Sequence, residues 1–281
     1  MSAAILPYLV EPAELAAALA RPGAAPLLLV YLGKHDHYLA GHIPGALWFD
    51  ARRLNGGIAP APGLLPDPQQ LETDFGAIGL GPSTHVVCHD DDGGTAGARM
   101  MWVLEAMGHS RMSMLNGGLE AWQTEGLMLD RDIPVIEPAN PAWKARPNTE
   151  VLATKQDVLA ALGNPRIRIL DSRSKDEFLG RKTNSARKGR IPGARSLDWQ
   201  STRDPANAHR LLPQKTLWAL LAAQGIDPRL ETIVHCQTHQ RSSHSFVMLR
   251  ALGFNHLRAY AGSWMEWAAD DSLPIIREDD S

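Results

Sequence analysis

Residues 104–122 read LEAMGHSRMSMLNGGLEAW, and residues 249–267 read LRALGFNHLRAYAGSWMEW. In both stretches a helical pattern ends near a glycine, a short apolar run follows, and Gly-Gly or Gly-Ser leads into a segment that ends in tryptophan. A glycine is a common helix stop, and a short apolar run between helices suits a buried strand. A repeated pattern of this length indicates a duplicated domain.

Further matched pairs occur in the same order along the chain. GHIPGALWFD begins at Gly41 and GRIPGARSLDW begins at Gly189, an offset of 148 residues. The motif LLP and a glycine before an apolar run each recur between these pairs. The offset falls from 148 residues here to 145 residues (249 − 104) in the last pair, as small insertions and deletions would produce. The chain therefore contains two copies of one domain.

The segment between the two copies has the composition of a linker. Residues 133–150, IPVIEPANPAWKARPNTE, contain four prolines and little apolar periodicity. We therefore predict one domain at residues 1–132 and a second at residues 151–281. Each is about 130 residues long, an ordinary size for a domain.

Each copy has the same order of expected elements. A helical pattern (residues 13–19 and 155–162) precedes a short apolar run (PLLLVYL and IRILD). A second run (HVVCH and TIVHC) then precedes a polar loop and another helix. Short, unalternating apolar runs that are separated by helices are typical of parallel strands buried on both faces. The fold class is therefore predicted to be α/β, with two similar domains that each have a parallel sheet flanked by helices.

The composition excludes two classes of partner. The 281 residues are 44% hydrophobic and 21% charged, with a net charge of −3 and a pI of about 6.4. A nucleic-acid-binding protein usually has a strongly basic face, so no nucleic-acid partner is expected. No apolar run approaches the roughly 18 residues that a membrane span requires, so no membrane partner is expected.

The N-terminus and the cysteines bear on the location of the protein. MSAAILPYLVEPAELAAAL has no basic segment before its apolar residues, so it does not resemble a signal peptide. The two cysteines, Cys88 and Cys236, form no disulfide framework. Free thiols persist in a reducing compartment, and we predict a cytoplasmic protein.

Residues 233–243, IVHCQTHQRSS, place Cys236 between a predicted strand and a predicted helix. The first N–H groups of a helix lack partners inside the helix, and the helix dipole is positive there. Both effects favour a thiolate, and Arg241 adds a permanent positive charge. Ligands of open α/β sheets bind at the carboxyl ends of the strands, where this cysteine lies. The alternative is that Cys236 is a small buried side chain without chemistry.

A second alternative is the chemistry of cysteine phosphatases and arsenate reductases. Their loops have five residues between the cysteine and the arginine, whereas four residues separate Cys236 from Arg241. A smaller ring of N–H donors fits one sulfur atom on the cysteine better than a tetrahedral phosphoryl group. The spacing therefore favours sulfur chemistry.

With these motifs the sequence resembles the tandem two-domain form of the rhodanese family. The resemblance covers nearly the whole chain and rests on CQTHQRS, on GHIPGA and GRIPGA, and on GGLEAW and GSWMEW. It implies two rhodanese-like domains, of which the first is inactive and the second carries the nucleophile, Cys236. It also implies that no metal and no organic cofactor is needed. The residues that would cradle the persulfide are Gln237, Thr238, His239, Gln240, Arg241 and Ser242.

The resemblance implies sulfur transfer by double displacement. Cys236 would take the outer sulfur of thiosulfate or a similar anion, and a thiophilic acceptor such as cyanide would remove it. The loop is similar to a bacterial type that reads CQTHHR, and it lacks the lysine and glycines of other tandem enzymes. Thiosulfate is therefore preferred to 3-mercaptopyruvate as donor. A persulfide carrier that passes sulfur to a partner protein is the alternative outside enzyme chemistry.

The first copy has no cysteine at the corresponding position. In VVCHDDDGG, Asp90 or Asp91 stands where Cys236 stands in the second copy. An aspartate cannot form a persulfide, and Cys88 lies too early, inside the strand, where packing is its expected role. The acidic residues 90–92 could attract a metal, but a degenerate loop is the simpler interpretation.

Other polar residues are candidates for supporting roles. The family has an Asp and an Arg near its active loop, which correspond to Asp171 and Arg173. The resemblance implies a substrate-binding role in which Arg173 orients the donor anion and Asp171 holds Arg173 or the loop; a structural ion pair is the alternative. Trp199 is predicted to wall the pocket or to pack in the core. Arg190 and the basic insert 181–190, with five basic residues, are predicted to form a substrate-binding rim or a solvated loop.

The histidines are assigned more modest roles. His239 is expected either to tune the charge near the thiol or to point to solvent. His235 precedes the cysteine, so its side chain lies on the opposite face of the strand and is not paired with the thiol. His35, His37 and His42 only loosely resemble a metal-binding set, and no metal is predicted there.

Overall fold

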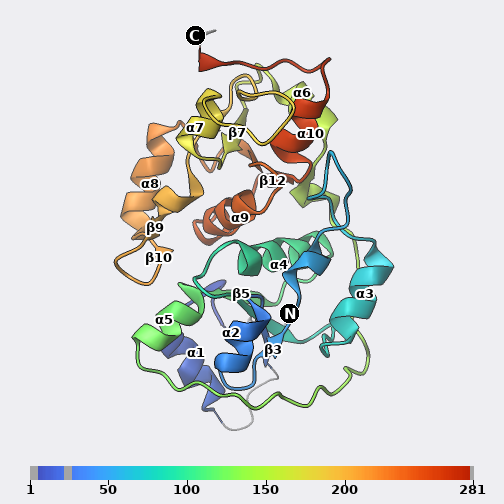
Figure 1. Cartoon of the computed structure of the whole chain (residues 1–281), viewed down its shortest axis with the longest axis vertical. Coiled ribbons are helices and arrows are strands. Elements are labelled where there is room, and N and C mark those ends of the chain that lie inside the picture. The colour runs from blue at the N-terminus through green and yellow to red at the C-terminus, as the bar shows by residue number, and fades with distance from the viewer. Residues whose placement is uncertain (1–5, 22–26, 279–281) are drawn as a thin grey trace. The chain divides into compact units, whose positions relative to one another are not determined.

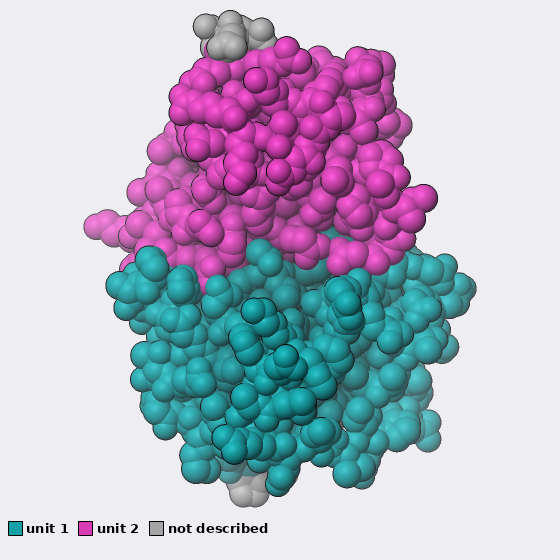
Figure 2. All heavy atoms as spheres, viewed as in Figure 1, with its two compact units in different colours: residues 1–54, 66–148, 204–211 teal, residues 55–65, 149–203, 212–281 magenta. Residues whose placement is uncertain are grey.

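The computed structural model describes residues 6–21 and 27–278 (Figure 1). The chain forms two compact units, which Figure 2 shows in different colours. Unit 1 comprises residues 1–54, 66–148 and 204–211, and unit 2 comprises residues 55–65, 149–203 and 212–281. Each unit thus takes one short segment from the other half of the sequence, which the predicted ranges 1–132 and 151–281 did not include.

Unit 1 is built on a parallel sheet in the order β1-β5-β4-β2-β3. The strands are β1 (Leu9–Val10), β2 (Leu27–Tyr31), β3 (Leu47–Trp48), β4 (His85–His89) and β5 (Met112–Leu115). The helices are α1 (Pro12–Leu19), α2 (His35–Ala40), η1 (Ala51–Leu54), α3 (Pro68–Gly76), α4 (Thr95–Ala106) and α5 (Gly118–Thr124).

Both faces of this sheet are covered. Successive side chains of a strand point to opposite faces, and every residue of β4 is buried. On one face Leu29, Tyr31 and Val87 form a core with residues of α1, α2 and α5, such as Leu15 and Trp122. On the other face α4 packs against β4 and β5 (Figure 1). The unalternating run HVVCH therefore reflects a central strand between two layers of helices.

Unit 2 repeats this architecture in the order β6-β12-β11-β7-β8, again with parallel strands. The strands are β6 (Leu152–Ala153), β7 (Ile167–Asp171), β8 (Arg195–Ser196), β11 (Glu231–His235) and β12 (Leu257–Tyr260). The helices are η2 (Thr149–Val151), α6 (Lys155–Ala161), α7 (Lys175–Leu179), η3 (Trp199–Thr202), α8 (Gln214–Ala223), α9 (Arg241–Ala251) and α10 (Ser263–Ala269). Two short strands, β9 (Arg203–Asp204) and β10 (Arg210–Leu211), lie in the chain between η3 and α8. The predicted α/β class, with a parallel sheet and flanking helices in each copy, is confirmed.

The core of unit 2 fixes the end of β11. Ile233 on β11 packs in one cluster with Trp264 and Trp267 of α10, and α9 packs on β11 and β12 from the other side. Burial of a large aliphatic side chain such as Ile233 stabilises a fold by about 1.5–3 kcal/mol relative to exposure. His235, the last residue of β11, is in register with Asp171, the last residue of β7. The carboxyl ends of the two central strands therefore meet at one edge.

None of the helices in the described part of the chain is both long enough and apolar enough to cross a membrane.

Candidate active site

Cys236 follows the last residue of β11 directly, and α9 begins five residues later at Arg241. Its thiol is free, and only 1% of the residue is exposed. The intervening loop turns sharply at His239, which has a φ of 56°. That conformation is uncommon for residues other than glycine. The strand–loop–helix arrangement predicted around the cysteine is present.

His239 is part of the loop's internal support. It is fully buried, and its Nδ1 lies 2.7 Å from Ser242 Oγ. Ser243 Oγ donates a hydrogen bond of 2.6 Å to the His239 carbonyl. The alternative in which His239 points to solvent is therefore wrong, because the tight turn directs the ring inward onto the first turn of α9.

Arg241 forms a two-pronged ion pair with Glu177 of α7. Its two terminal nitrogens donate to the Glu177 carboxylate at 2.6 and 2.8 Å. Burial raises the pKa of Glu177, but hydrogen bonds from Arg241 and Ser174 outweigh it and lower that pKa to about 2. Burial lowers the pKa of Arg241, but the Glu177 hydrogen bond and the charge of a Cys236 thiolate outweigh this effect and raise that pKa overall. The guanidinium is thus held by Glu177, interacts electrostatically with Cys236 and is always charged.

Glu177 was not singled out from the sequence. The one local signal is Ser174-x-x-Glu177, which is a capping box: Ser174 Oγ accepts from the Glu177 N–H, and the carboxylate accepts from the Ser174 N–H. That pattern predicts the start of a helix and gives no hint of a distant arginine. In the structure the same carboxylate serves both contacts.

The two glutamines of the loop are tied by their side chains within unit 2. Gln237 Nε2 donates to Ser185 Oγ at 2.6 Å, and Gln240 Nε2 donates to Asn55 Oδ1 at 2.7 Å. Ser185 belongs to the basic insert 181–190, and Asn55 begins the segment 55–65. Gly63, in the same segment 55–65, packs directly against the loop, since a Cβ atom at this residue would lie 2.2 Å from the Thr238 carbonyl oxygen.

Asp171 and Arg173 form a closed ion pair. Arg173 is 1% exposed, and its Nε and one terminal nitrogen both reach the Asp171 carboxylate, at 2.6–3.0 Å. Burial raises the pKa of Asp171, but the charges of Arg173 and His235 lower it overall. The guanidinium also stacks 4.5 Å from the ring centre of Trp264, and the backbone N–H of Trp264 donates to the Cys236 carbonyl. These contacts support the strand ends, and contact with substrate stays a prediction for this pair.

The remaining candidates lie further along the chain in unit 2. Arg190 exchanges backbone hydrogen bonds with Ile276, and its guanidinium lies 5.0 Å from the Phe178 ring centre. Trp199, at the start of η3, is half-buried and meets the ring of the buried His244 edge-on at 5.3 Å. Arg203 stacks on the Trp199 ring at 4.8 Å. The role of Trp199, as a wall of the pocket or as part of the core, and the substrate role of Arg190 stay predictions.

The corresponding loop of unit 1 begins at Asp90, directly after the last residue of β4. Its carboxylate accepts hydrogen bonds from the backbone N–H groups of Gly94, Ala96 and Gly97, at 2.8–3.0 Å. Asp90, rather than Asp91, therefore occupies the position of Cys236. Cys88 is fully buried inside β4, where burial and the charge of Asp90 raise the pKa of its thiol.

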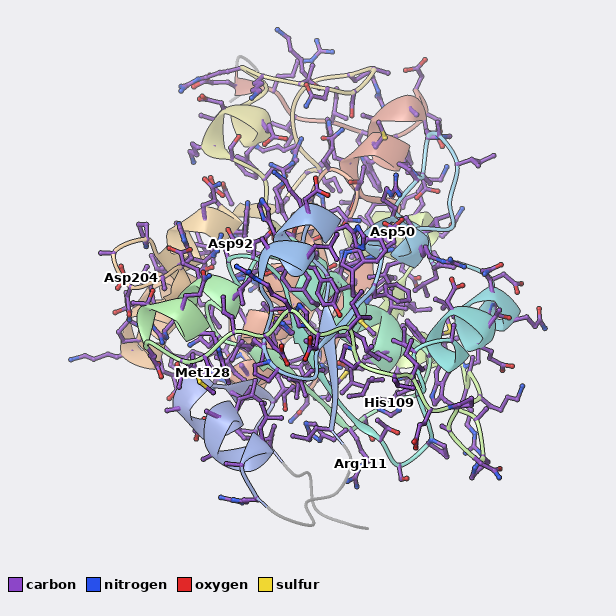
Figure 3. The ribbon with its side chains drawn as sticks, turned by 60° about the horizontal axis from the view of Figure 1, so that its bottom comes forward. Asp50, Asp92, His109, Arg111, Met128 and Asp204 are labelled. Atoms are coloured by element: carbon purple, nitrogen blue, oxygen red, sulfur yellow. The ribbon has the colours of Figure 1, made fainter. Side chains whose placement is uncertain are left out.

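A cavity of about 660 Å³ opens at this edge of unit 1, lined in part by Trp48, Asp50, Asp91 and Asp92. Figure 3 shows Asp50 and Asp92 at this end of the unit and His109 and Arg111, which precede β5, at the other. The Asp91 carboxylate is hydrogen-bonded to Tyr31 and to His37. Burial raises the pKa of Asp91, but these hydrogen bonds outweigh burial and lower that pKa overall. Among the described residues, no group of three or more His, Cys, Asp or Glu side chains is arranged to hold a metal ion.

Comparison with known proteins decides the family. The rhodanese-like domain family matches residues 11–125 and 154–270, which together are most of the chain. The chain belongs to the rhodanese-like family. The match falls once on each half of the sequence, so the duplication inferred from the repeated motifs is a tandem pair of rhodanese-like domains.

Curated relatives match the rhodanese-like chain over nearly its whole length. It is 38% identical over 270 residues to a thiosulfate sulfurtransferase of Pseudomonas aeruginosa, covering 96% of this chain and 97% of the relative. It is 39% identical over 272 residues to a thiosulfate sulfurtransferase of Azotobacter vinelandii, with coverages of 97% and 98%. A 3-mercaptopyruvate sulfurtransferase of Escherichia coli is 28% identical, with 85% of each chain covered.

Among solved structures, the anaerobic ergothioneine biosynthesis enzyme of Chlorobium limicola superimposes with a TM-score of 0.86. The alignment covers 96% of this chain and 70% of that one, at 21% sequence identity. At this identity the likeness shows the shared rhodanese-like fold alone.

Proposed function

We propose that this rhodanese-like protein is a sulfurtransferase that moves sulfur from thiosulfate to a thiophilic acceptor through a persulfide on Cys236. The observation that carries the proposal is the position of the thiol. Cys236 directly follows the carboxyl end of the central strand β11, and a five-residue step leads to the start of α9, where Glu177 holds the guanidinium of Arg241 in place. The names of the relatives that match over the whole chain support the same activity.

In the first half-reaction the Cys236 thiolate attacks the outer sulfur of thiosulfate. A new S–S bond forms on the cysteine, the S–S bond of thiosulfate breaks, and sulfite leaves with its electron pair. The N–H groups at the start of α9 and the charge of Arg241 stabilise the sulfur anion that remains on the enzyme. Because Arg241 is fixed before substrate arrives, little reorganisation is needed during the step.

In the second half-reaction an acceptor nucleophile attacks the outer sulfur of the persulfide. With cyanide the product is thiocyanate, and the Cys236 thiolate is regenerated. The loop residues 237–242 serve both half-reactions, since the anion returns to the same cradle. This is covalent catalysis with a double displacement, and it uses neither a metal nor an organic cofactor.

A second donor, 3-mercaptopyruvate, has support of its own. Relatives named 3-mercaptopyruvate sulfurtransferase match 85% of the chain, at 28% identity for the Escherichia coli protein. Thiosulfate is preferred because two relatives named thiosulfate sulfurtransferase, at 38% and 39% identity, match 96% and 97% of the chain. Parallel assays with the two donors at equal concentration, which measure thiocyanate in both cases and pyruvate in the second, rank them directly.

Intact-mass spectrometry tests the proposal. Incubation with thiosulfate should add about 32 Da, the mass of one sulfur in a cysteine persulfide. Cyanide should remove this mass, and the Cys236→Ala variant should not acquire it. Absence of the adduct with either donor, together with hydrolysis of an aryl phosphate, would overturn the proposal in favour of phosphatase chemistry. An adduct that resists cyanide and leaves only with a partner protein would favour a sulfur carrier.

The free state of both cysteines supports a reducing compartment, and we place the protein in the cytoplasm. Its proposed partners are a small anionic sulfur donor and a small acceptor; a protein that accepts sulfur is the alternative. Fractionation of cells, with blotting of each fraction, tests the location.

A further inference from the structure

Ser263, the first residue of α10, has a backbone conformation that a serine seldom adopts. Its φ is 58°, in the left-handed region, and the residue is fully buried. Such a conformation costs roughly 1 kcal/mol or more for a residue with a side chain. At the corresponding place in unit 1 stands Gly118, with a φ of 60°. The same turn therefore exists in both units, and only in unit 2 does it carry a side chain.

The backbone around this turn holds the start of the active loop. Trp264 N–H donates to the Cys236 carbonyl at 3.0 Å, and Met265 N–H donates to the Gln237 carbonyl at 3.1 Å. Unit 1 has the same pair of bonds, from Leu119 to Asp90 and from Glu120 to Asp91, both 2.9 Å. These bonds belong to the fold and do not distinguish the two units.

The side chain of Ser263 adds a contact that a glycine cannot make. Its hydroxyl donates to the Tyr260 carbonyl at 2.9 Å, which orients the oxygen, and it accepts from the Cys236 N–H at 3.4 Å. With the bond from Trp264, the peptide groups on both sides of the Cys236 Cα atom are held by α10. In unit 1 a side chain is excluded, since a Cβ atom on Gly118 would lie 2.3 Å from the Gly93 nitrogen.

We infer that Ser263 is a positioning residue for the nucleophile: its hydroxyl fixes the Cys236 amide so that the sulfur stays centred in the loop as it gains and loses the transferred atom. The inference rests on the proposed sulfur transfer and adds a residue outside the loop to its machinery.

Two variants separate positioning from stability. Ser263→Gly removes the hydroxyl and relieves the left-handed strain, whereas Ser263→Ala removes the hydroxyl and keeps the strain. Ser263→Ala should therefore melt at a lower temperature than Ser263→Gly. If the hydroxyl positions Cys236, both variants should form the persulfide more slowly by the same factor, about threefold to tenfold, as expected for one lost hydrogen bond. The apparent Kd for thiosulfate in single-turnover experiments should not change.

A second readout does not depend on sulfur chemistry. The chain has two cysteines, so labelling with ¹⁵N-cysteine gives two amide signals, and Cys88 in unit 1 serves as the internal control. In both variants the Cys236 amide should shift and exchange with solvent faster, while the Cys88 amide stays unchanged.

The inference is overturned if Ser263→Gly matches the wild type in persulfide formation and in amide exchange, or if the rates of the two variants follow their melting temperatures. If the wild type forms no persulfide, the proposed function fails, and the amide signals still decide whether Ser263 holds Cys236.

Discussion

The loops at residues 90–97 and 236–243 have the same length and the same turn, with a positive φ at Gly93 and at His239, but they begin with different residues, Asp90 and Cys236. In unit 1 the loop N–H groups bind the Asp90 carboxylate, a charge that is part of the chain. In unit 2 the cysteine sulfur takes that place, and a serine at residue 263 and an arginine at residue 241 replace Gly118 and Thr95. The comparison teaches that this loop binds a carboxylate of the chain in unit 1, and we propose that in unit 2 it binds the sulfur anion of a thiol, aided by the fixed charge of Arg241.

The largest expected effect comes from removing the nucleophile. Cys236→Ala should abolish thiocyanate formation, because no other side chain in the loop can carry the sulfur. Cys88→Ala is the matched control: it removes the other thiol, from the core of unit 1, and should leave the rate unchanged when assayed below the melting temperature. Residual persulfide on the Cys236→Ala protein would contradict the assignment.

Removal of the fixed charge should have the next largest effect. Arg241→Ala should lower kcat with thiosulfate by about 10²-fold, the size seen when one preorganised electrostatic group is lost from an active site. Arg241→Lys keeps a positive charge but cannot make both hydrogen bonds to Glu177, so its kcat should lie between those of the wild type and Arg241→Ala. A kcat of Arg241→Ala equal to that of the wild type would remove the role assigned to Arg241.

The Asp90 cradle should matter for stability alone. Asp90→Ala leaves three backbone N–H groups without their carboxylate, and hydrogen bonds to charged groups contribute about 1.5–3 kcal/mol each. The free energy of unfolding, from urea titration, should therefore fall by a few kcal/mol, while kcat changes little. A large loss of kcat with unchanged stability would mean that unit 1 takes part in the chemistry, and the comparison of the two loops would be wrong.

The smallest effect concerns the Glu177–Arg241 pair and pH. The folded-state pKa of Glu177 lies near 2, below its ordinary value of 4.5, so ionised Glu177 stabilises the folded state fully above about pH 4.5. That contribution is lost as the pH falls toward 2. The melting temperature of Glu177→Gln should therefore be lower than that of the wild type at pH 7, and the difference should shrink below pH 4.5. A difference that is constant down to pH 3 would contradict this assignment.

Much of the fold was predictable because the signals were local. The repeated motifs, the apolar runs and the glycine stops predicted two α/β domains with parallel sheets, and the family match agrees. Residues 55–65 and 204–211 were not predicted to pack with the opposite half of the sequence. The composition of neither segment indicates which unit it will join, since the choice of unit depends on how the loops pack.

The candidate site divides in the same way. The sequence alone determined the position of the thiol, the length of its loop, the presence of Arg241 and the loss of the cysteine from the first copy, because these depend on neighbours within a few residues. Only the tertiary structure decided what holds the loop. Glu177 is 64 residues from Arg241, and Asn55 is 185 residues from Gln240. Their pairing, like the contact of Ser263 with Cys236, follows from the packing of distant segments around the strand ends, and no local pattern in the chain specifies it.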